Sequence, residues 1–267
     1  MRYSDYGFPK HVTVAEKKAK NQKAIEKLGK KDPSLTPVII NGRKLARTWW
    51  GIAWNDNLER YSDYSNRIGR GSSYVRNGAV LDLKIDQGKI TAQVQGSRSK
   101  PYKIDIEIQP LSGKTWEIIT KECEGKIESL QELIEGRFPK ALEELFTAKG
   151  KGLFPSPKEI SLNCSCPDWA NMCKHVAAVL YGVGARLDEN PTLFFVLRNV
   201  NIDELVSKAI SQKSETLLKK SGKKSSRVID NDNISAMFGI DMEAEMEKPI
   251  TKEKTKKKVS GKKKDNT

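Results

Sequence analysis

The sequence lacks several features on which common enzyme classes depend. Its 267 residues include only two histidines and no phosphate-binding loop of the form G-x-x-x-x-G-K-[ST], which excludes a P-loop ATPase. The zinc deaminase pattern, H-x-E followed by P-C-x-x-C, is also missing. No run of 18 apolar residues occurs, so no membrane span is expected. The first residues contain no apolar stretch of the signal-peptide type, and a cytoplasmic protein is therefore predicted.

Cysteine is scarce as well, but three of the four cysteines stand close together with a histidine. Cys164, Cys166, Cys173 and His175 have the spacing C-x-C-x₆-C-x-H. Thiolates and imidazole are the usual ligands of structural zinc, and three cysteines with one histidine complete a tetrahedral shell. The sequence therefore predicts one structural zinc ion. The alternatives are plain buried thiols, or a disulfide if the chain were exported.

The ligand spacing also predicts the local backbone. Alternate residues of a flat strand have Cα atoms roughly 6.5–7 Å apart, whereas two sulfurs on one tetrahedral zinc lie only about 3.8 Å apart. The strand predicted over residues 159–166 must therefore bend at its end, where Pro167 fits. On a regular helix, Cys173 and His175 would point about 200° apart. We expect Cys173 to precede or open a helix, with His175 in its first turn.

This pattern, with a strand before it and a helix after it, resembles the SWIM zinc finger, whose ligands follow C-x-C-x(n)-C-x-H. The resemblance implies the same four ligands here. The runs 47–51 and 94–98 also look like those of bacterial and archaeal proteins that carry one such finger. By this resemblance SWIM fingers bind DNA or proteins, and small bacterial relatives look like companions of Snf-class helicases.

Positive charge is in clear excess, with a formal net charge of +14. Part of this excess lies from Lys219 onward, but the preceding residues carry a net positive charge too. Basic proteins of this size commonly bind polyanions, of which nucleic acid is the most frequent. The alternative is that the lysines only keep the protein in solution.

Arginine and tyrosine gather in two segments that are expected to be loops, residues 61–78 and 98–103. Neither a helical nor a strand period is visible in the first. Arginine forks onto phosphates and tyrosine offers a ring on which bases stack. The alternative is an ordinary polar loop whose tyrosines pack inward. The candidate nucleic-acid contacts are Arg67, Arg70, Tyr74, Arg76, Arg98, Lys100 and Lys174.

Hydrophobic periodicity predicts an α+β protein. A small antiparallel three-stranded meander over residues 80–108 is expected to be covered by helices. A ββα-like zinc finger with flanking helices should follow, and then a disordered basic tail. Trp50, Trp54 and Cys123 are expected in the core. The expected divisions are a basic N-terminal arm with a helix (1–46), an α+β body (47–150), the finger with its following helices (151–213) and the tail (214–267).

One apolar segment interrupts the polar tail at residues 230–242. Ile234, Met237 and Phe238 have helical spacing within it. Such a segment is typical of a peptide that folds when it docks onto a partner. The alternative is that it packs back onto the body.

Together these features predict a non-enzymatic zinc-binding module without a small-molecule substrate. It is expected to bind nucleic acid, DNA rather than RNA, or to dock onto a nucleic-acid machine such as a Snf-class helicase. The rival prediction is a protein–protein adaptor that makes no nucleic-acid contact. A zinc enzyme is disfavoured, because a catalytic zinc keeps one position open for water and four protein ligands leave none.

Overall fold

The structure is a computed structural model that describes residues 12–60, 65–137 and 139–221. The chain divides into two units, residues 1–218 and 219–267, and the architecture below belongs to the first. Among the helices in the described ranges, none is both long and apolar enough to cross a membrane. The segment 230–242, with Ile234, Met237 and Phe238, lies outside the described residues.

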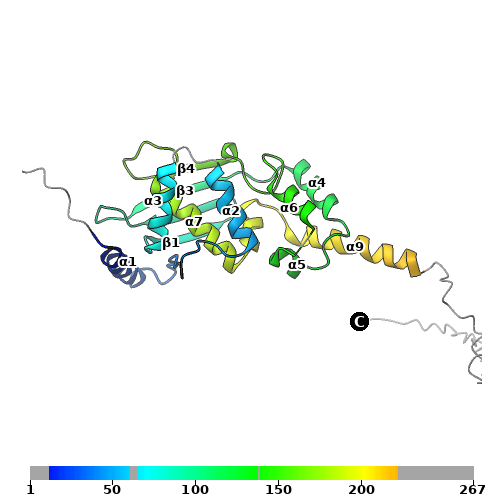
Figure 1. Ribbon diagram of the computed structural model, residues 1–267, viewed down its shortest axis with the longest axis horizontal. Helices are drawn as coiled ribbons and strands as arrows, with labels where there is room; N and C mark the ends of the chain where they lie inside the picture. Colours follow the sequence, from blue (N-terminus) through cyan, green and yellow to red (C-terminus); the bar gives the residue numbers. More distant parts are fainter. Residues whose placement is uncertain (1–11, 61–64, 138, 222–267) are drawn as a thin grey trace, which may run out of the picture. The chain divides into compact units, whose positions relative to one another are not determined.

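The first unit is built from one sheet and several helices, as Figure 1 shows. In chain order the described elements are α1 (Val14–Gly29), α2 (Trp49–Arg60), α3 (Ser65–Arg76), β1 (Val80–Asp86), β2 (Lys89–Val94), β3 (Tyr102–Ile108), α4 (Gly113–Cys123), α5 (Leu130–Glu135), α6 (Lys140–Thr147), the 3₁₀ turn η1 (Pro157–Glu159), β4 (Ile160–Cys164), α7 (Lys174–Glu189), α8 (Thr192–Leu197) and α9 (Ile202–Ser221). The predicted α+β class is therefore confirmed.

The four strands form one antiparallel sheet in the order β1-β2-β3-β4. The predicted meander over residues 80–108 is confirmed as β1 to β3, and Gly88, with a φ of +64°, turns the first hairpin. β4 extends the sheet, with Cys164 opposite Ile104 of β3. The segment predicted to form a zinc finger therefore supplies a single strand, and the strand beside it belongs to the preceding part of the chain. The sheet therefore contains strands from both the predicted body (47–150) and the predicted finger segment (151–213).

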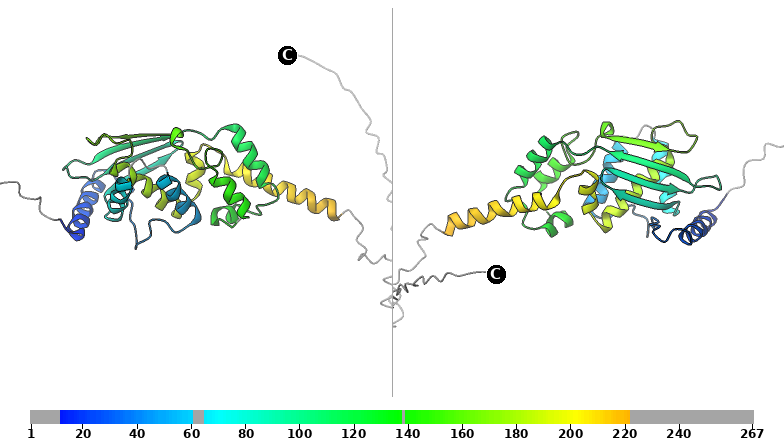
Figure 2. Two further views of the ribbon diagram at one scale, coloured as in Figure 1. Left: turned by 45° about the horizontal axis from the view of Figure 1, so that its top comes forward. Right: turned by 180° about the vertical axis from the view of Figure 1, so that it is seen from behind.

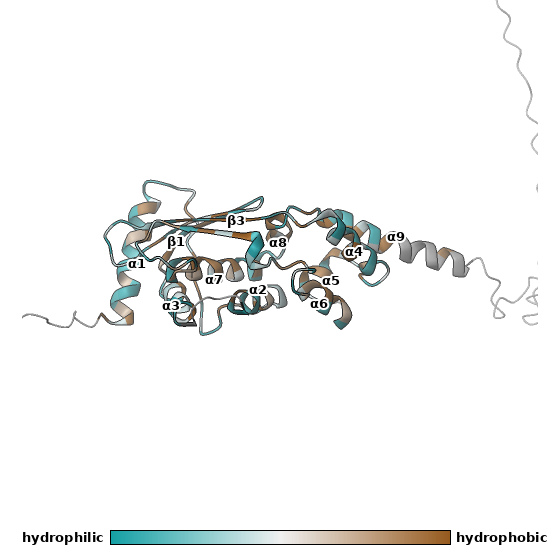
Figure 3. Cartoon of the chain, turned by 90° about the horizontal axis from the view of Figure 1, so that it is seen from above, coloured by the Kyte–Doolittle hydropathy of each residue, from teal (hydrophilic) through white to brown (hydrophobic). Residues whose placement is uncertain are grey.

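The two faces of the sheet differ in polarity. Along β3, buried apolar side chains from Tyr102 to Ile108 alternate with more exposed polar ones. Helix α7 lies along the apolar face, and α2 and α3 pack on α7 on the same side of the sheet (Figure 3). Seen from behind, the strands stand in front of these helices (Figure 2). This is the arrangement expected for an antiparallel sheet with one face packed on the core.

Helix α7 is the central helix of the core. Every residue from His175 to Gly184 is buried, because α7 contacts the sheet on one side and α2, α3 and α8 on others. A helix that is apolar nearly all round is typical of a core position. The predicted metal ligand His175 therefore belongs to the most enclosed helix of the described residues.

Helix α3 lies within the segment 61–78, where the sequence predicted a loop, and that prediction was wrong for residues 65–76. The side of α3 that packs on α7 carries Ile68, Gly71 and Val75. Because Gly71 stands in the middle of this stripe, the regular spacing of apolar residues that would indicate a helix is interrupted in the sequence. A Cβ on Gly71 would lie 2.5 Å from the Cβ of Ala177, so the two helices approach closely. This packing overrides the low helix propensity of a segment rich in glycine and serine.

The predicted core position of the tryptophans is confirmed. Trp50 and Trp54 are both fully buried. The Trp50 ring lies 5.6 Å from the ring of Phe194 and 6.0 Å from that of Phe146. Its indole Nε1 donates a hydrogen bond of 3.1 Å to the carbonyl of Leu133. One side chain of run 47–51 thus connects the α5–α6 region with α2 and α8.

A carboxylate at the end of α7 holds the start of α2. Asp188 accepts hydrogen bonds from the backbone N–H groups of Arg47 and Thr48, at 2.6 and 2.9 Å. These groups precede the first turn of α2, where backbone N–H groups have no partner within the helix. A Cβ on Gly51 would lie 2.5 Å from an oxygen of Asp188. The glycine is therefore needed for this close approach.

Both ends of the described chain carry helices. The predicted N-terminal helix is confirmed as α1, but a polar contact docks it, because Asn21 is buried and its Nδ2 donates to the carbonyl of Asn77 at 2.8 Å. At the other end, α9 continues to Ser221, although a disordered tail was predicted from residue 214. The prediction ended α9 too early, because lysine, leucine and glutamate between residues 213 and 220 favour helix.

The contact between α3 and α7 predicts opposite effects for two glycines of one helix. Gly71→Ala should lower the free energy of unfolding by about 1–3 kcal/mol, because the added methyl overpacks the interface. Gly69→Ala is the matched control, since a Cβ at Gly69 meets no atom within 4 Å. It should raise the free energy of unfolding by about 0.5–1 kcal/mol. Urea denaturation measures both, and equal effects would contradict the close packing.

Candidate metal centre

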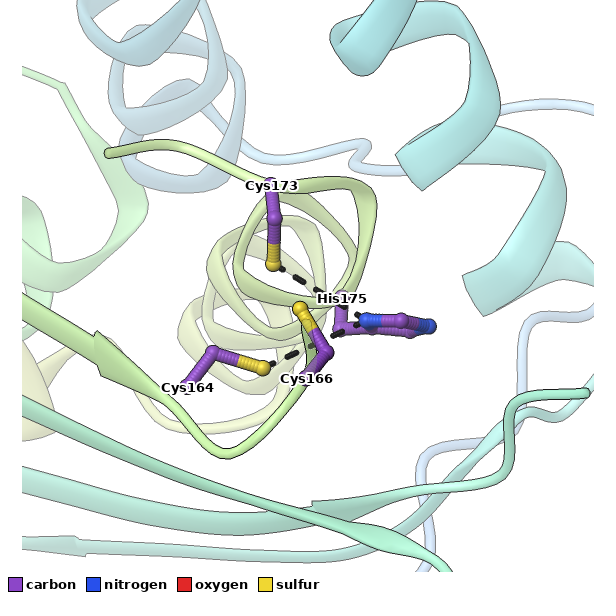
Figure 4. Close-up of side chains that lie close together, drawn as sticks. All are labelled: Cys164, Cys166, Cys173 and His175. Carbon is purple, nitrogen blue, oxygen red and sulfur yellow. Dashed lines mark hydrogen bonds between the residues drawn. The ribbon is translucent and has the colours of Figure 1, made fainter. Parts of the chain in front are cut away.

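Four side chains meet where β4 ends and α7 begins, as Figure 4 shows. Cys164 is the last residue of β4 and Cys166 follows in the bend. Cys173 is the N-cap residue of α7, and His175 is the second residue of that helix. The predicted strand end and helix start are therefore confirmed. The ligand atoms of the four side chains all lie within 4.8 Å of one another.

The separations fit a zinc ion. His175 Nδ1 lies 3.8 Å from the sulfur of Cys173 and 4.0 Å from that of Cys164. With bonds of about 2.3 Å to sulfur and about 2.0–2.1 Å to nitrogen, tetrahedral zinc keeps its ligand atoms about 3.6–3.8 Å apart. All three cysteines are free thiols rather than disulfides. The donor set therefore fits one zinc ion with Nδ1 as the imidazole ligand, and four protein ligands make a closed, structural shell.

The cluster already favours one thiolate. The pKa of Cys173 is lowered to about 4, mainly because the Cys164 thiol hydrogen-bonds to its sulfur, with a further hydrogen bond from His175. The pKa of Cys164 is raised, first by that same hydrogen bond and then by burial. The pKa of Cys166 is raised mainly by burial. A divalent cation removes the repulsion between neighbouring thiolates, and for this reason metal binding releases protons.

Two tyrosine rings hold the imidazole of His175. Its ring centroid lies 4.5 Å from that of Tyr102 and 5.3 Å from that of Tyr74. The nitrogen that faces away from the cysteines, Nε2, is buried and has no hydrogen-bond partner within the described residues. Packing against the tyrosines, rather than a hydrogen bond from Nε2, therefore orients this ligand.

A glycine makes room for this packing. A Cβ on Gly96 would overlap the ring of Tyr102 and lie 3.2 Å from His175 Nε2. The neighbouring Gln95 fixes the turn, because its Nε2 donates hydrogen bonds to the carbonyls of Gly96 and Arg98, at 3.1 and 2.6 Å. Run 94–98, which carried part of the resemblance, thus has a structural role beside the metal centre.

Arg67 is paired within the protein. Its Nη2 lies 3.1 Å from an oxygen of Asp168, and the two side chains are only 20% and 14% exposed. Asp168 stands in the loop between Cys166 and Cys173, so the pair ties that loop to α3. This differs from the predicted phosphate contact at Arg67. Asp168 was not among the predicted site residues. Its position between two predicted metal ligands is the one feature of the sequence that indicates a role near the site.

Two of the predicted contact residues lie beside the tyrosines that pack on His175. Arg70 lies close enough to Tyr74 to lower its pKa, although burial has the larger effect and raises it. The guanidinium carbon of Arg98 lies 5.9 Å from the ring centroid of Tyr102. An arginine of α3 and an arginine of the connection between β2 and β3 thus each lie beside a tyrosine that packs on His175. Tyr102 is a further residue that the sequence did not single out.

The remaining candidates lie apart from this pair. Arg76 follows Tyr74 by two residues and so points to another side of α3, where its Nε donates to the carbonyl of Arg43 at 3.3 Å. Lys100 is exposed in the connection between β2 and β3, and Lys174 is half-buried at the first position of α7.

Replacement of one ligand should abolish metal binding. Cys166→Ser is expected to lose the zinc ion and to lower the melting temperature, since zinc binding free energy contributes to folding free energy. Native mass spectrometry under reducing conditions measures the metal content. Cys123→Ser is the control, because Cys123 is a fully buried thiol of the core whose pKa burial raises to about 12. A Cys166→Ser variant with unchanged zinc and melting temperature would contradict the site.

Comparison with known proteins agrees with this geometry. Residues 151–183 match the family model described as the SWIM zinc finger, which is a binding module and not a catalytic family. The uncharacterized protein Rv2102 of Mycobacterium tuberculosis is 35% identical over 172 residues, 64% of this chain. The match spans 62% of that relative's length. No solved structure matches the chain. Residues 151–183, with a Cys₃His cluster close enough to bind one zinc ion, are therefore a SWIM zinc finger.

Proposed function

We propose that the chain is a non-enzymatic zinc module that binds nucleic acid, DNA in the first place, on the side of the metal centre where His175 lies. The binding surface is named the His175 flank and comprises Arg70, Tyr74 and Arg98. The observation that supports it most is the double contact at His175, where tyrosines of α3 and β3 pack on one ligand, each beside an arginine.

The chemistry of the His175 flank suits a polyanion. Arginine forks onto phosphate oxygens and also stacks on bases, and tyrosine offers a further ring. Phosphate contacts of this kind provide most of the affinity in non-specific binding. The formal net charge of +14 adds long-range attraction to any nucleic acid.

Zinc contributes rigidity to this surface. The closed Cys₃His shell fixes the bend between β4 and α7, and with it the ring of His175 on which Tyr74 and Tyr102 rest. Side chains that are held in place before binding lose less conformational entropy when a ligand arrives. The role we propose for the metal is therefore to preorganise the contact residues.

A protein–protein adaptor is the second candidate, and Trp169 favours it. This side chain is 79% exposed in the ligand loop of the finger. Tryptophan is enriched among the residues that carry most of the binding energy in protein interfaces. The protein partner that we propose is a nucleic-acid machine such as a Snf-class helicase, and such docking is compatible with nucleic-acid contact at the His175 flank.

The salt dependence of DNA binding tests the proposal. Arg70→Gln combined with Arg98→Gln should reduce the slope of log affinity against log salt by about 1.8 on duplex DNA, because each phosphate contact contributes about 0.9. Arg43→Gln combined with Arg60→Gln is the control, since both arginines are exposed and lie outside the His175 flank.

Fluorescence anisotropy over a salt series measures the slopes of both double variants. An equal reduction in the control pair would assign the effect to total charge and contradict the His175 flank. If the native chain bound neither DNA nor RNA at low salt, the adaptor would replace the proposal.

A further inference from the structure

A cleft of about 430 Å³ opens next to the His175 flank, between α1, α3 and the end of β2. Its volume falls in the range of small-ligand sites, about 300–1,000 Å³. Its lining includes Lys17, Lys20, Ser73, Tyr74, Gln95 and Ser97.

The lining of this cleft is cationic and contains no carboxylate. Three other clefts of the described residues each include at least two acidic side chains, and a fourth is lined by no charged residue. Lys17 and Lys20 are both exposed on α1. Of these five clefts, theirs is the one whose charged lining residues are all positive. Charge complementarity points to an anionic occupant.

The walls of the cleft are held in place without a ligand. The hydrogen bond of 2.8 Å from Asn21 to the carbonyl of Asn77 fixes α1 against the end of α3. Tyr74, on the same wall as Asn77, packs on His175 and is thereby tied to the metal centre. A site formed in advance loses less free energy to ordering when it binds.

The polar groups of the cleft suit the edge of a base. Gln95 is only 5% exposed, and its amide nitrogen donates hydrogen bonds to the carbonyls of Gly96 and Arg98. Its Oε1 receives no hydrogen bond from any described residue, so this oxygen stays available as an acceptor. The hydroxyl groups of Ser73 and Ser97 line the same space. Such groups hydrogen-bond to the exocyclic amino and ring N–H groups of bases.

We infer that this cleft receives one unstacked nucleotide of a single-stranded nucleic acid, with its phosphate at Lys17 and Lys20 and its base against Tyr74. The inference rests on the proposed function and narrows it from nucleic acid to single strands. A base in a duplex has both faces covered by its neighbours, whereas a base in a single strand is free to turn its face to an aromatic ring.

Filling the cleft tests this inference. Ser73→Trp places an indole at an exposed position of the lining and leaves the charge unchanged. The affinity for a short oligothymidine should fall about tenfold, which matches the loss of one stacked base. The affinity for a duplex of the same length and the zinc content should stay as in the native chain. Ser207→Trp, at an exposed serine of α9 outside the cleft, is the control and should change neither affinity.

The lysines give an independent measurement. Lys17→Ala combined with Lys20→Ala should reduce the salt slope for oligothymidine by about 1.4, because each phosphate contact on a single strand contributes about 0.7. Lys18→Ala combined with Lys23→Ala removes the same charge from the same helix but outside the cleft. This control pair should leave the slope close to that of the native chain.

The outcomes separate the two proposals. If the native chain binds duplex and single strand equally and Ser73→Trp changes neither affinity, the single-strand inference fails while nucleic-acid binding stands. If thymidine monophosphate binds as tightly as oligothymidine and Ser73→Trp abolishes both, the cleft belongs to a free nucleotide and the single-strand inference fails as well. If no nucleic acid binds at low salt, both proposals fail.

Discussion

The meeting of a strand end and a helix start in one Cys₃His cluster is the constraint on which the rest of the first unit depends. β4 is hydrogen-bonded to β3 of the body, and α7 is buried from His175 to Gly184. A zinc ion at this point therefore connects the sheet to its central helix and stabilises more than a local loop. Small zinc fingers have little core of their own. This finger shares the core of the body, so metal binding and body packing stabilise the same structure.

Two glycines allow the side chains around the metal centre to pack closely. Gly71 lets α3 approach α7 closely, and Gly96 lets Tyr102 reach His175. Together they bring aromatic side chains from two elements onto one metal ligand. Because the rings pack on the imidazole, a shift of the metal centre would also move the arginines beside them. The positions of the two tyrosine rings are therefore tied to the geometry of the metal centre.

Local patterns in the sequence were sufficient for the metal ligands and for the meander. Ligand spacing predicts the bend after Cys164, and period-two alternation predicts the three strands, since both depend on neighbouring residues. The helical character of α3 was missed because Gly71 replaces the large apolar residue that periodicity requires. The pair Arg67–Asp168 spans 101 positions and depends on how the finger loop folds over α3. No local pattern carries that information.

The basic side chains differ in whether a carboxylate of the protein already neutralises them. Four arginines, Arg67, Arg137, Arg186 and Arg198, each pair with a carboxylate at 3.1 Å or less, so their fields are largely cancelled at short range. Lys17, Lys20, Arg70 and Arg98, by contrast, form no ion pair with any residue in the described ranges. These four surround Tyr74 and Tyr102 in the cleft and on the His175 flank. The nucleic-acid contact that we propose at the His175 flank uses two of these unpaired arginines, whereas the carboxylate of Asp168 already neutralises Arg67.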